Sequence, residues 1–251
     1  MEKAAYEKQL VVLAQAFKYE ELLELAGQLV QDYPSWHIAW HYLAVAHGLK
    51  GNHEAAVENF IQALKHKPTS TKALYGLSVS FHALKMYDKA IACLLKYRTI
   101  NKSGFKDSFC LGINFAELGD HAEAVKYFKE ALTFEANNEG LLFCLADSFR
   151  ILGQYKDAVS YFEKSLTLNP KNVNVLHNTA VSYAGMNDKV QAILYYQKAL
   201  SCDENFTRSL RNLAELYIEN GNTSAAKQLI LNLQRLDPNA DYVMQLTQFV
   251  S

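Results

Sequence analysis

The sequence contains one pair of residues whose spacing matches part of a metal site. His37 and His41 are four residues apart, so a helix would present both imidazoles on one face. No third ligand accompanies them at a suitable spacing, and His37 falls where we expect a helix to begin. We therefore interpret the pair as polar surface or as packing at the helix start, and we expect neither a metal nor a cofactor.

Four cysteines could in principle form disulfides or bind a metal: Cys93, Cys110, Cys144 and Cys202. None belongs to a CxxC motif, although Cys110 and Cys144 are separated by one full period of the repeat described below. We interpret all four as small side chains of a protein in a reducing compartment, which predicts a cytoplasmic location.

Other chemistry has little support in the sequence. It contains no G-x-S-x-G turn, no glycine-rich phosphate loop and no H-E-x-x-H pair, so we do not expect an enzyme. The formal net charge of −1 argues against a nucleic-acid binder, which needs a basic excess. No apolar run reaches the roughly 18 residues of a membrane span, so we expect no membrane insertion. The apolar segment 10–16 follows Glu2 and Glu7, which do not suit the basic leader of a signal peptide.

The dominant feature of the sequence is a period of 34 residues. When the unit is numbered from His37, position 20 is alanine in successive copies: Ala56, Ala90, Ala124, Ala158, Ala192 and Ala226. The four prolines of the chain all fall on position 32: Pro34, Pro68, Pro170 and Pro238. Such self-similarity is typical of a protein built from repeated structural units.

Each unit reads as two amphipathic helices joined by a short turn. Small residues at positions 8 and 20 let the helices approach closely, and large residues at positions 4, 7, 11 and 24 fill the space around that contact. Gly or Asn at position 15 suits the left-handed conformation that ends a helix, and proline at position 32 ends the second helix. In the third unit Lys102 replaces the proline, and we expect Ser103 and Gly104 to form a glycine-assisted turn.

The phase of the repeat divides the chain into seven units and a final helix. We expect repeats at residues 3–36, 37–70, 71–104, 105–138, 139–172, 173–206 and 207–240, followed by a cap helix at 241–251. One helix pair cannot bury its apolar faces alone, whereas stacked pairs bury them continuously. The predicted fold is therefore an all-α solenoid of antiparallel helix pairs that occupies residues 1–251 as a single domain.

This pattern resembles the tetratricopeptide repeat (TPR) family, whose signature also has 34 residues. The residues of the second repeat that match the signature are Trp40, Leu43, Ala44, His47, Ala56, Phe60, Ala63 and Pro68, with Ala in place of Gly and His in place of Tyr. The resemblance covers essentially the whole chain. It implies a right-handed superhelix that binds a peptide or a protein partner in its concave groove.

In TPR proteins, positions 2, 5, 9 and 12 of the first helix typically point into the groove. Carried over to this sequence, positions 5 and 9 of repeats two to five imply an apolar strip: Val45, Tyr75, Val79, Phe109, Ile113 and Phe143. A contiguous exposed apolar patch usually marks an interaction site, so the strip predicts contact with an apolar helix or an extended peptide. The alternative is that strong curvature lets these side chains pack on one another across the groove.

Polar and charged residues occupy the other predicted groove positions: His41, Asp147, Arg150, His177, Asn178, Arg208, Arg211 and Asn212. We expect the charged residues of repeats five to seven to fix one end of the partner. Asn178 and Asn212 fall on position 6, where one TPR subtype holds the peptide backbone with a ladder of asparagines. The carboxylate clamp of chaperone-binding members is not matched by any three consecutive repeats.

These features predict a non-catalytic scaffold or adaptor whose partner is a protein or a peptide. Two alternatives remain open at this point. The chain could be a structural module that forms homo-oligomers through its terminal repeats, or it could be the regulatory TPR domain of a larger protein.

Overall fold

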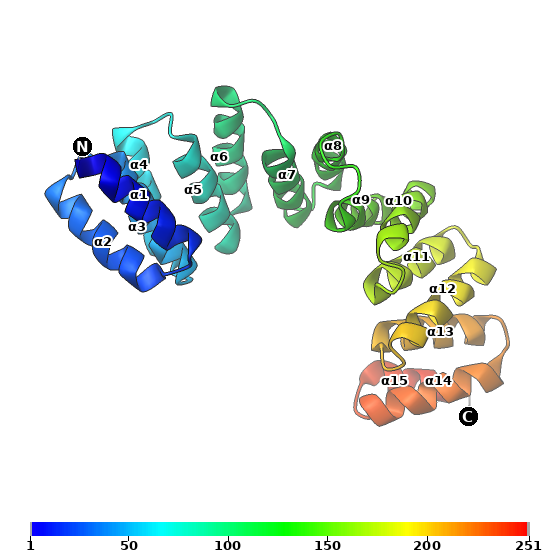
Figure 1. The fold of residues 1–251 in the computed structure, drawn as a ribbon. Helices are drawn as coiled ribbons and strands as arrows, with labels where there is room; N and C mark the ends of the chain where they lie inside the picture. The colour runs from blue at the N-terminus through cyan, green and yellow to red at the C-terminus, as the bar shows by residue number, and fades with distance from the viewer. Residues whose placement is uncertain (1, 250–251) are drawn as a thin grey trace. The chain divides into compact units, whose positions relative to one another are not determined.

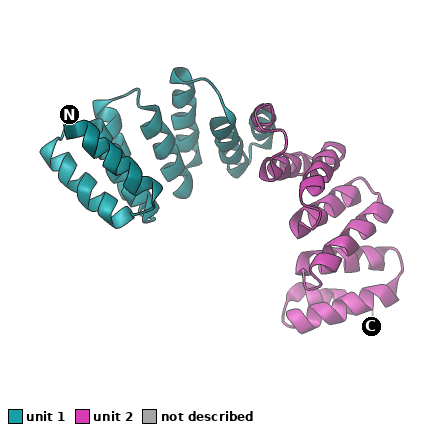
Figure 2. Cartoon of the chain, viewed as in Figure 1, with its two compact units in different colours: residues 1–127 teal, residues 128–251 magenta. Residues whose placement is uncertain are grey.

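The structure is a computed structural model that describes residues 2–249, and in this range it contains helices and turns but no strand. The chain divides into two compact units, residues 1–127 (unit 1) and residues 128–251 (unit 2), as Figure 2 shows. The division falls inside helix α8 (His121–Leu132). The predicted cap helix at 241–251 is described only as far as Phe249, because Val250 and Ser251 lie outside the described residues.

The helices repeat with the period of the sequence. In unit 1 they are α1 (Glu2–Gln15), α2 (Tyr19–Asp32), α3 (His37–Leu49), α4 (His53–His66), α5 (Thr71–Ala83), α6 (Tyr87–Ile100) and α7 (Phe105–Glu117). In unit 2 they are α9 (Glu139–Ile151), α10 (Tyr155–Leu168), α11 (Val173–Gly185), α12 (Lys189–Cys202), α13 (Thr207–Glu219), α14 (Thr223–Leu236) and α15 (Asp241–Gln248). From α3 to α15, successive odd-numbered helices begin 34 residues apart.

From α1 to α7, and again from α9 to α15, each helix packs on the next one along the chain (Figure 1). Odd-numbered helices also touch one another within each unit, α1 with α3 and α3 with α5 in unit 1, and α9 with α11 in unit 2. The predicted all-α solenoid of helix pairs is therefore confirmed. Among the described residues no helix combines the length and the hydrophobicity that a membrane crossing requires.

The columns of small and large residues form the core of both units. The six alanines of position 20 are all 0% exposed. The large side chains of position 24 are at most 3% exposed: Phe60, Leu94, Phe128, Phe162, Tyr196 and Ile230. The tightest approach is at Gly76 of α5, where a Cβ atom would lie 2.3 Å from the Phe60 ring. Only glycine lets α5 lie this close to α4.

Position 15 has a left-handed backbone in every repeat. The residues with positive φ are Phe17, Gly51, Lys85, Gly119, Gly153, Asn187 and Gly221. The hydrogen bonds around Gly51 show why: its N–H donates to the Gly48 carbonyl at 3.0 Å, and the next N–H, of Asn52, donates to the His47 carbonyl at 2.9 Å. This Schellman pattern satisfies carbonyls that the helix end leaves unpaired.

The residue after the left-handed position often caps the second helix of its repeat. The sequence pattern described above did not predict these caps. Asn52 Oδ1 accepts a hydrogen bond from the Ala55 N–H at 3.3 Å. The carboxylate of Asp188 and the amide oxygen of Asn222 accept equivalent bonds, at 3.1 and 3.2 Å, at the starts of α12 and α14. Two adjacent residues thus end one helix and begin the next.

The link between α6 and α7 is not the glycine-assisted turn expected at residues 102–104. Gly104 has an extended backbone (φ −152°, ψ −178°), which any residue can adopt. Instead, the Gly104 N–H donates to Asp107 Oδ1 at 2.9 Å, and the second carboxylate oxygen lies 3.5 Å from Arg98 Nε. A carboxylate that is 3% exposed therefore fixes the start of α7, in a link that lacks the proline found before α3, α5, α11 and α15.

Candidate functional site

The apolar residues predicted for unit 1 lie on α3, α5 and α7 and differ in exposure. Val79 on α5 is 46% exposed. Val45, Tyr75, Phe109 and Ile113 are half-buried. These four therefore contribute both to the packing of the repeats and to the surface, whereas Val79 contributes mainly to the surface.

A pocket of about 170 Å³ brings part of the strip together between α5 and α7. It is lined by Ser78, Val79, His82, Cys110, Ile113 and Asn114. Tyr75 lies beside it, with its hydroxyl 3.5 Å from Cys110 Sγ. Burial raises the pKa of the Tyr75 phenol and of the Cys110 thiol, so neither is charged at neutral pH.

Two further polar residues line this pocket. His82 Nδ1 lies 3.1 Å from Asn114 Oδ1, and the Asn114 amide donates to the Cys110 carbonyl at 2.7 Å. His82 falls on position 12 of its repeat, one of the positions that the family geometry places in the groove. Asn114 falls on a position to which that geometry assigns no groove role.

Aromatic residues of the predicted strip pack against rings of their own repeats. The Tyr75 ring lies 6.2 Å from Tyr97, and the Phe109 ring stacks on Phe105 at 5.5 Å. In unit 2, the Phe143 ring lies 5.9 Å from Phe162. These contacts hold the rings in place and leave part of each half-buried ring on the surface.

His41 lies closer to the core than the strip does. Its ring packs 5.0 Å from Tyr42 and 5.5 Å from Phe60. Its Nδ1 atom is buried and has no hydrogen-bond partner within residues 2–249. Burial, reinforced by the charge of Lys72 and by His37, lowers the pKa of His41 to about 4, so the imidazole is neutral at pH 7.

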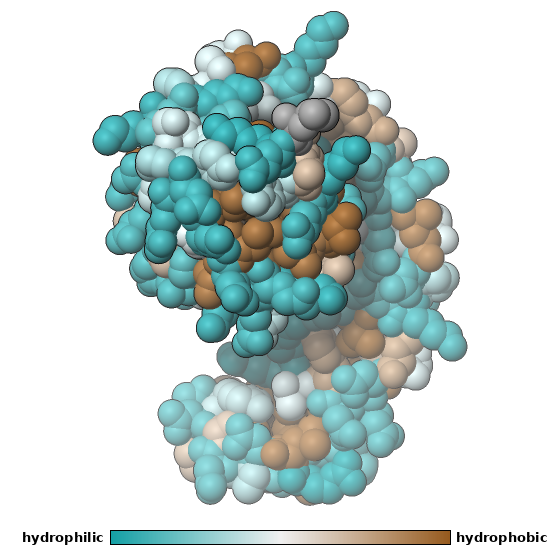
Figure 3. All heavy atoms as spheres, turned by 60° about the vertical axis from the view of Figure 1, so that its left-hand side comes forward, coloured by the Kyte–Doolittle hydropathy of each residue, from teal (hydrophilic) through white to brown (hydrophobic). Residues whose placement is uncertain are grey.

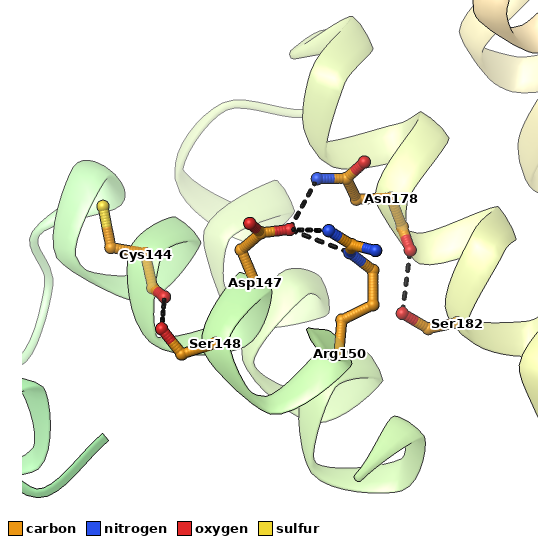
Figure 4. A network of polar contacts seen from close by, with 6 residues as sticks. All are labelled: Cys144, Asp147, Ser148, Arg150, Asn178 and Ser182. Atoms are coloured by element: carbon orange, nitrogen blue, oxygen red, sulfur yellow. Dashed lines mark hydrogen bonds and ion pairs between the residues drawn. The ribbon is translucent and has the colours of Figure 1, made fainter. Parts of the chain in front are cut away.

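In unit 2, a polar network joins α9 to α11 (Figure 4). Asp147 Oδ1 accepts hydrogen bonds from Arg150 Nε at 2.8 Å and from Asn178 Nδ2 at 3.1 Å. Arg150 Nη2 also lies 2.8 Å from the same oxygen. Ser182 anchors the far side by donating to the Asn178 carbonyl at 2.8 Å. Three predicted groove residues, Asp147, Arg150 and Asn178, are thus brought together and bonded to one another.

His177 is the member of the predicted set that lies inside the stack, at 5% exposure. Its Nδ1 lies 2.9 Å from Ser209 Oγ, and its ring packs 5.5 Å from Phe206. Burial, with smaller contributions from Arg208 and Arg150, lowers its pKa to about 4. The residue links α11 to α13 and presents almost no surface to a partner.

The remaining predicted residues lie on α13 and are also engaged. Arg208 donates to the Asn174 side chain, and Arg211 Nε donates to Glu215 Oε1 at 2.9 Å. The Asn212 amide donates to the Tyr196 hydroxyl at 3.1 Å. Both asparagines of the suggested ladder, Asn178 and Asn212, therefore already use one amide N–H within the chain.

A second pocket, of about 300 Å³, opens beside Asn212 between α11 and α13. Glu215, Glu219 and Lys189 contribute charge to its wall, and Lys189 Nζ lies 3.1 Å from Glu219 Oε2. Within the described residues, no group of three or more His, Cys, Asp or Glu side chains is arranged to hold a metal ion.

Four models of one family match the chain, each described as tetratricopeptide repeat. They cover residues 43–104, 111–138, 140–172 and 183–248. Together with the helix pairs, they show that the chain belongs to the TPR family. This family and fold are those of protein–protein interaction scaffolds. The sequence has no significant match among curated proteins.

Solved structures of other TPR proteins share the fold. The C-terminal part of a TPR repeat-containing protein from Cytophaga hutchinsonii matches with a TM-score of 0.80 and 16% identity, over 96% of this chain and 98% of that one. YrrB, described as a TPR protein with an unusual peptide-binding site, matches with a TM-score of 0.68 and 18% identity, over 74% and 95%.

A chain of the APC/C hetero-tetramer Cut9–Hcn1 matches with a TM-score of 0.64 and 17% identity. The match covers 98% of this chain and 49% of that chain, so this protein spans about half of its length. At these identities the likeness shows the fold and carries no assignment of a partner.

Proposed function

We propose that the protein is a non-catalytic scaffold that binds a peptide or a helix of a protein partner on its odd-numbered helices. The main contact is the apolar strip of unit 1, centred on α5 and α7. The proposal rests on the exposure of Val79: this side chain is 46% exposed and lines an apolar pocket together with Ile113. An exposed apolar side chain beside a pocket gains free energy when a partner covers it.

The size of that gain sets what else the partner must contact. Full burial of an exposed valine or isoleucine side chain contributes about 1.5–3 kcal/mol. Val79 and Ile113 are already partly buried, so a partner that covers them gains only part of that amount from each. Micromolar binding requires about 8 kcal/mol after the costs of association and ordering. The strip therefore needs help from further contacts, such as polar contacts to the half-buried His82 beside it.

The test is a selection of peptides from a displayed random library on the wild-type chain, followed by binding of the selected peptides to variants. Val79→Asp with Ile113→Asp places charge in the pocket and is expected to weaken binding at least about tenfold. Val190→Asp is the matched control, because Val190 is 75% exposed on the even-numbered helix α12.

Circular dichroism would verify that both variants keep the helix content of the wild type. Loss of binding in the pocket variant with full binding in the Val190 variant supports the proposal. Equal binding by all three proteins would remove the strip from the binding surface.

Self-assembly is a second candidate, favoured by exposed apolar residues on the first hairpin. Val12 is 62% exposed and Phe17 is 71% exposed. Figure 3, which brings the left-hand side of Figure 1 forward, shows hydrophobic side chains gathered between hydrophilic ones on that face. Sedimentation velocity over a range of concentrations tests self-assembly. If the chain self-assembles, larger species should form as the concentration rises, and the double substitution Val12→Asp with Phe17→Asp should abolish them.

We also infer that the protein works in a reducing compartment such as the cytoplasm. All four cysteines are unpaired. Burial raises the pKa of the Cys93 and Cys144 thiols to about 11, which keeps them protonated and unreactive at neutral pH.

A further inference from the structure

A polar pocket in unit 1 lies apart from the apolar strip. Its volume is about 210 Å³, and it forms where α3 meets the turn that joins α4 to α5. The polar side chains that matter here are His37, His41, Lys67, Thr69, Thr71 and Lys72. Helix α1 contributes Glu7 to the same pocket.

The charge around this pocket is mainly positive. Lys67 and Lys72 are exposed lysines that line it, and neither forms an ion pair with the residues that the structure describes. Glu7 is its acidic lining residue, on the α1 side. Two ammonium groups in one pocket, without carboxylate partners, favour an anionic ligand.

The start of α5 adds hydrogen-bond donors to this charge. Ser70 caps the helix by accepting a bond from the Ala73 N–H at 3.4 Å, and Thr71 and Lys72 form the first turn. N–H groups in a first helical turn have no partner inside the helix, and the helix dipole favours negative charge beside them. Side-chain hydroxyls of Thr69 and Thr71 line the same pocket.

His41 supplies an observation that is independent of the helix start. It lines the pocket, and its Nδ1 atom is buried without a hydrogen-bond partner in the described part of the chain. Buried polar atoms in folded proteins are normally bonded to protein, water or ligand. His41 therefore brings a side chain with an unmet hydrogen bond to the wall of the pocket.

We propose that this pocket binds a phosphate group, held by Lys67, Lys72, the imidazoles of His37 and His41, and the start of α5. Phosphate suits the pocket better than carboxylate, because the pocket offers more donors than two carboxylate oxygens can accept. The inference stands on the pocket alone and does not depend on the apolar strip.

Binding of phosphate at this position is coupled to proton uptake. Burial and then Lys67 lower the pKa of His37, with opposition from Glu7 and a small contribution from His66. Burial and then Lys72 lower the pKa of His41 to about 4, with His37 adding to the effect. A bound anion offsets the two lysine charges, so both imidazoles become easier to protonate.

The test follows the imidazole signals of the histidines by NMR during a titration with inorganic phosphate at pH 6.5 and constant ionic strength. Signals of His37 and His41 should shift and saturate. The signal of His177, which is buried in unit 2, should not move and serves as an internal control. A parallel titration with acetate measures the response to a carboxylate.

Two pairs of lysine substitutions complete the test. Lys67→Ala with Lys72→Ala should weaken phosphate binding by about tenfold or more, whereas Lys171→Ala with Lys227→Ala, at exposed lysines of unit 2, should leave it unchanged. All four lysines are exposed, so the variants should keep the helix content of the wild type. A linear response without saturation, an equal response to acetate, or equal weakening by both pairs overturns the proposal.

Discussion

The two units share a packing scheme and differ in the surface of their odd-numbered helices. In unit 1, Val79 and Ile113 line an apolar pocket. In unit 2, the corresponding surface carries Asp147, Arg150 and Asn178, which are bonded to one another. The positions that pack one helix on the next therefore hold similar residues in both units. The positions at the surface of the odd-numbered helices hold different residues in the two units.

This difference has an energetic consequence for binding. A partner that covers Val79 removes apolar surface from water and breaks no existing bond. Asn178 and Arg211 already use part of their hydrogen-bonding capacity on Asp147 and Glu215, so a partner that binds them shares or replaces those bonds. Because the net gain from exchanging one hydrogen bond for another is small, unit 1 should supply most of the affinity and unit 2 most of the selectivity.

The largest expected effect tests the claim that the two cores are equivalent. Phe60 in unit 1 and Phe162 in unit 2 occupy position 24 and are 3% and 0% exposed. Phe60→Ala and Phe162→Ala should each lower the free energy of unfolding by about 3–5 kcal/mol, because each leaves a cavity. Urea denaturation measures both, and a loss below about 1 kcal/mol at either site would show that the cores are not equivalent.

Stability should fall in acid because of one buried histidine in each unit. His41 and His177 have folded pKa values of about 4, below the ordinary value of about 6.5. The unfolded chain therefore binds protons that the folded chain does not. The stabilisation is complete above about pH 6.5 and decreases as the pH falls towards 4, by roughly 1–3 kcal/mol for each residue.

Urea denaturation at pH 7 and pH 4.5 tests this prediction in the wild type, His41→Gln and His177→Gln. Each variant should lose less stability than the wild type over this interval, because it has one histidine fewer to protonate on unfolding. A loss that is identical in all three proteins would assign the acid sensitivity to other groups, such as the carboxylates.

Glycine substitutions probe the close approach of helices in unit 1. Gly76→Ala places a methyl group 2.3 Å from the Phe60 ring and should lower the free energy of unfolding by about 1–3 kcal/mol. Gly27→Ala in α2 meets no atom within 4 Å and should raise stability by about 0.5–1 kcal/mol, because alanine favours the helix. Thermal unfolding of the two variants should show shifts of opposite sign, and shifts of the same sign would contradict the packing at Gly76.

The 34-residue phase predicts much of the fold. Proline at position 32 and the small residues at positions 8 and 20 place the helices, because these residues act through local backbone geometry and through contacts that every repeat makes. The family geometry also indicates which helices carry the candidate surface. The small residues recur in repeats two to seven and the proline in four of the seven repeats, so this information is readable from the sequence.

The partners of individual polar side chains could not be predicted in this way. His177 is buried because Ser209 and Phe206 of the next repeat close over it. Gly104 has an extended backbone because Asp107 caps α7. The pocket around His37 combines side chains from three segments, which become neighbours only when the repeats stack. Each case depends on a contact between repeats that the period alone does not specify.

A further small effect concerns the left-handed position of the turns. Lys85 in unit 1 has φ 58°, and Gly153 occupies the same position in unit 2 with φ 73°. Lys85→Gly should raise the free energy of unfolding by about 1 kcal/mol, because glycine adopts this conformation without strain, and Gly153→Ala should lower it by about the same amount. Urea denaturation of both variants measures the two effects, and a destabilised Lys85→Gly would show that the lysine side chain contributes more than the strain costs.

One binding experiment that compares the two units tests most directly whether a partner binds unit 1. Methyl signals of Val79 and Ile113 in unit 1, and of Val181 on α11 in unit 2, would be followed by NMR during titration with a peptide selected on the wild-type chain. Val181 is the matched reference, because it occupies position 9 of its repeat, as Val79 and Ile113 do. If the apolar strip of unit 1 is the binding surface, the signals of Val79 and Ile113 should shift most and the signal of Val181 should shift little. A large shift at Val181 with unmoved Val79 and Ile113 would contradict this prediction and assign binding to unit 2.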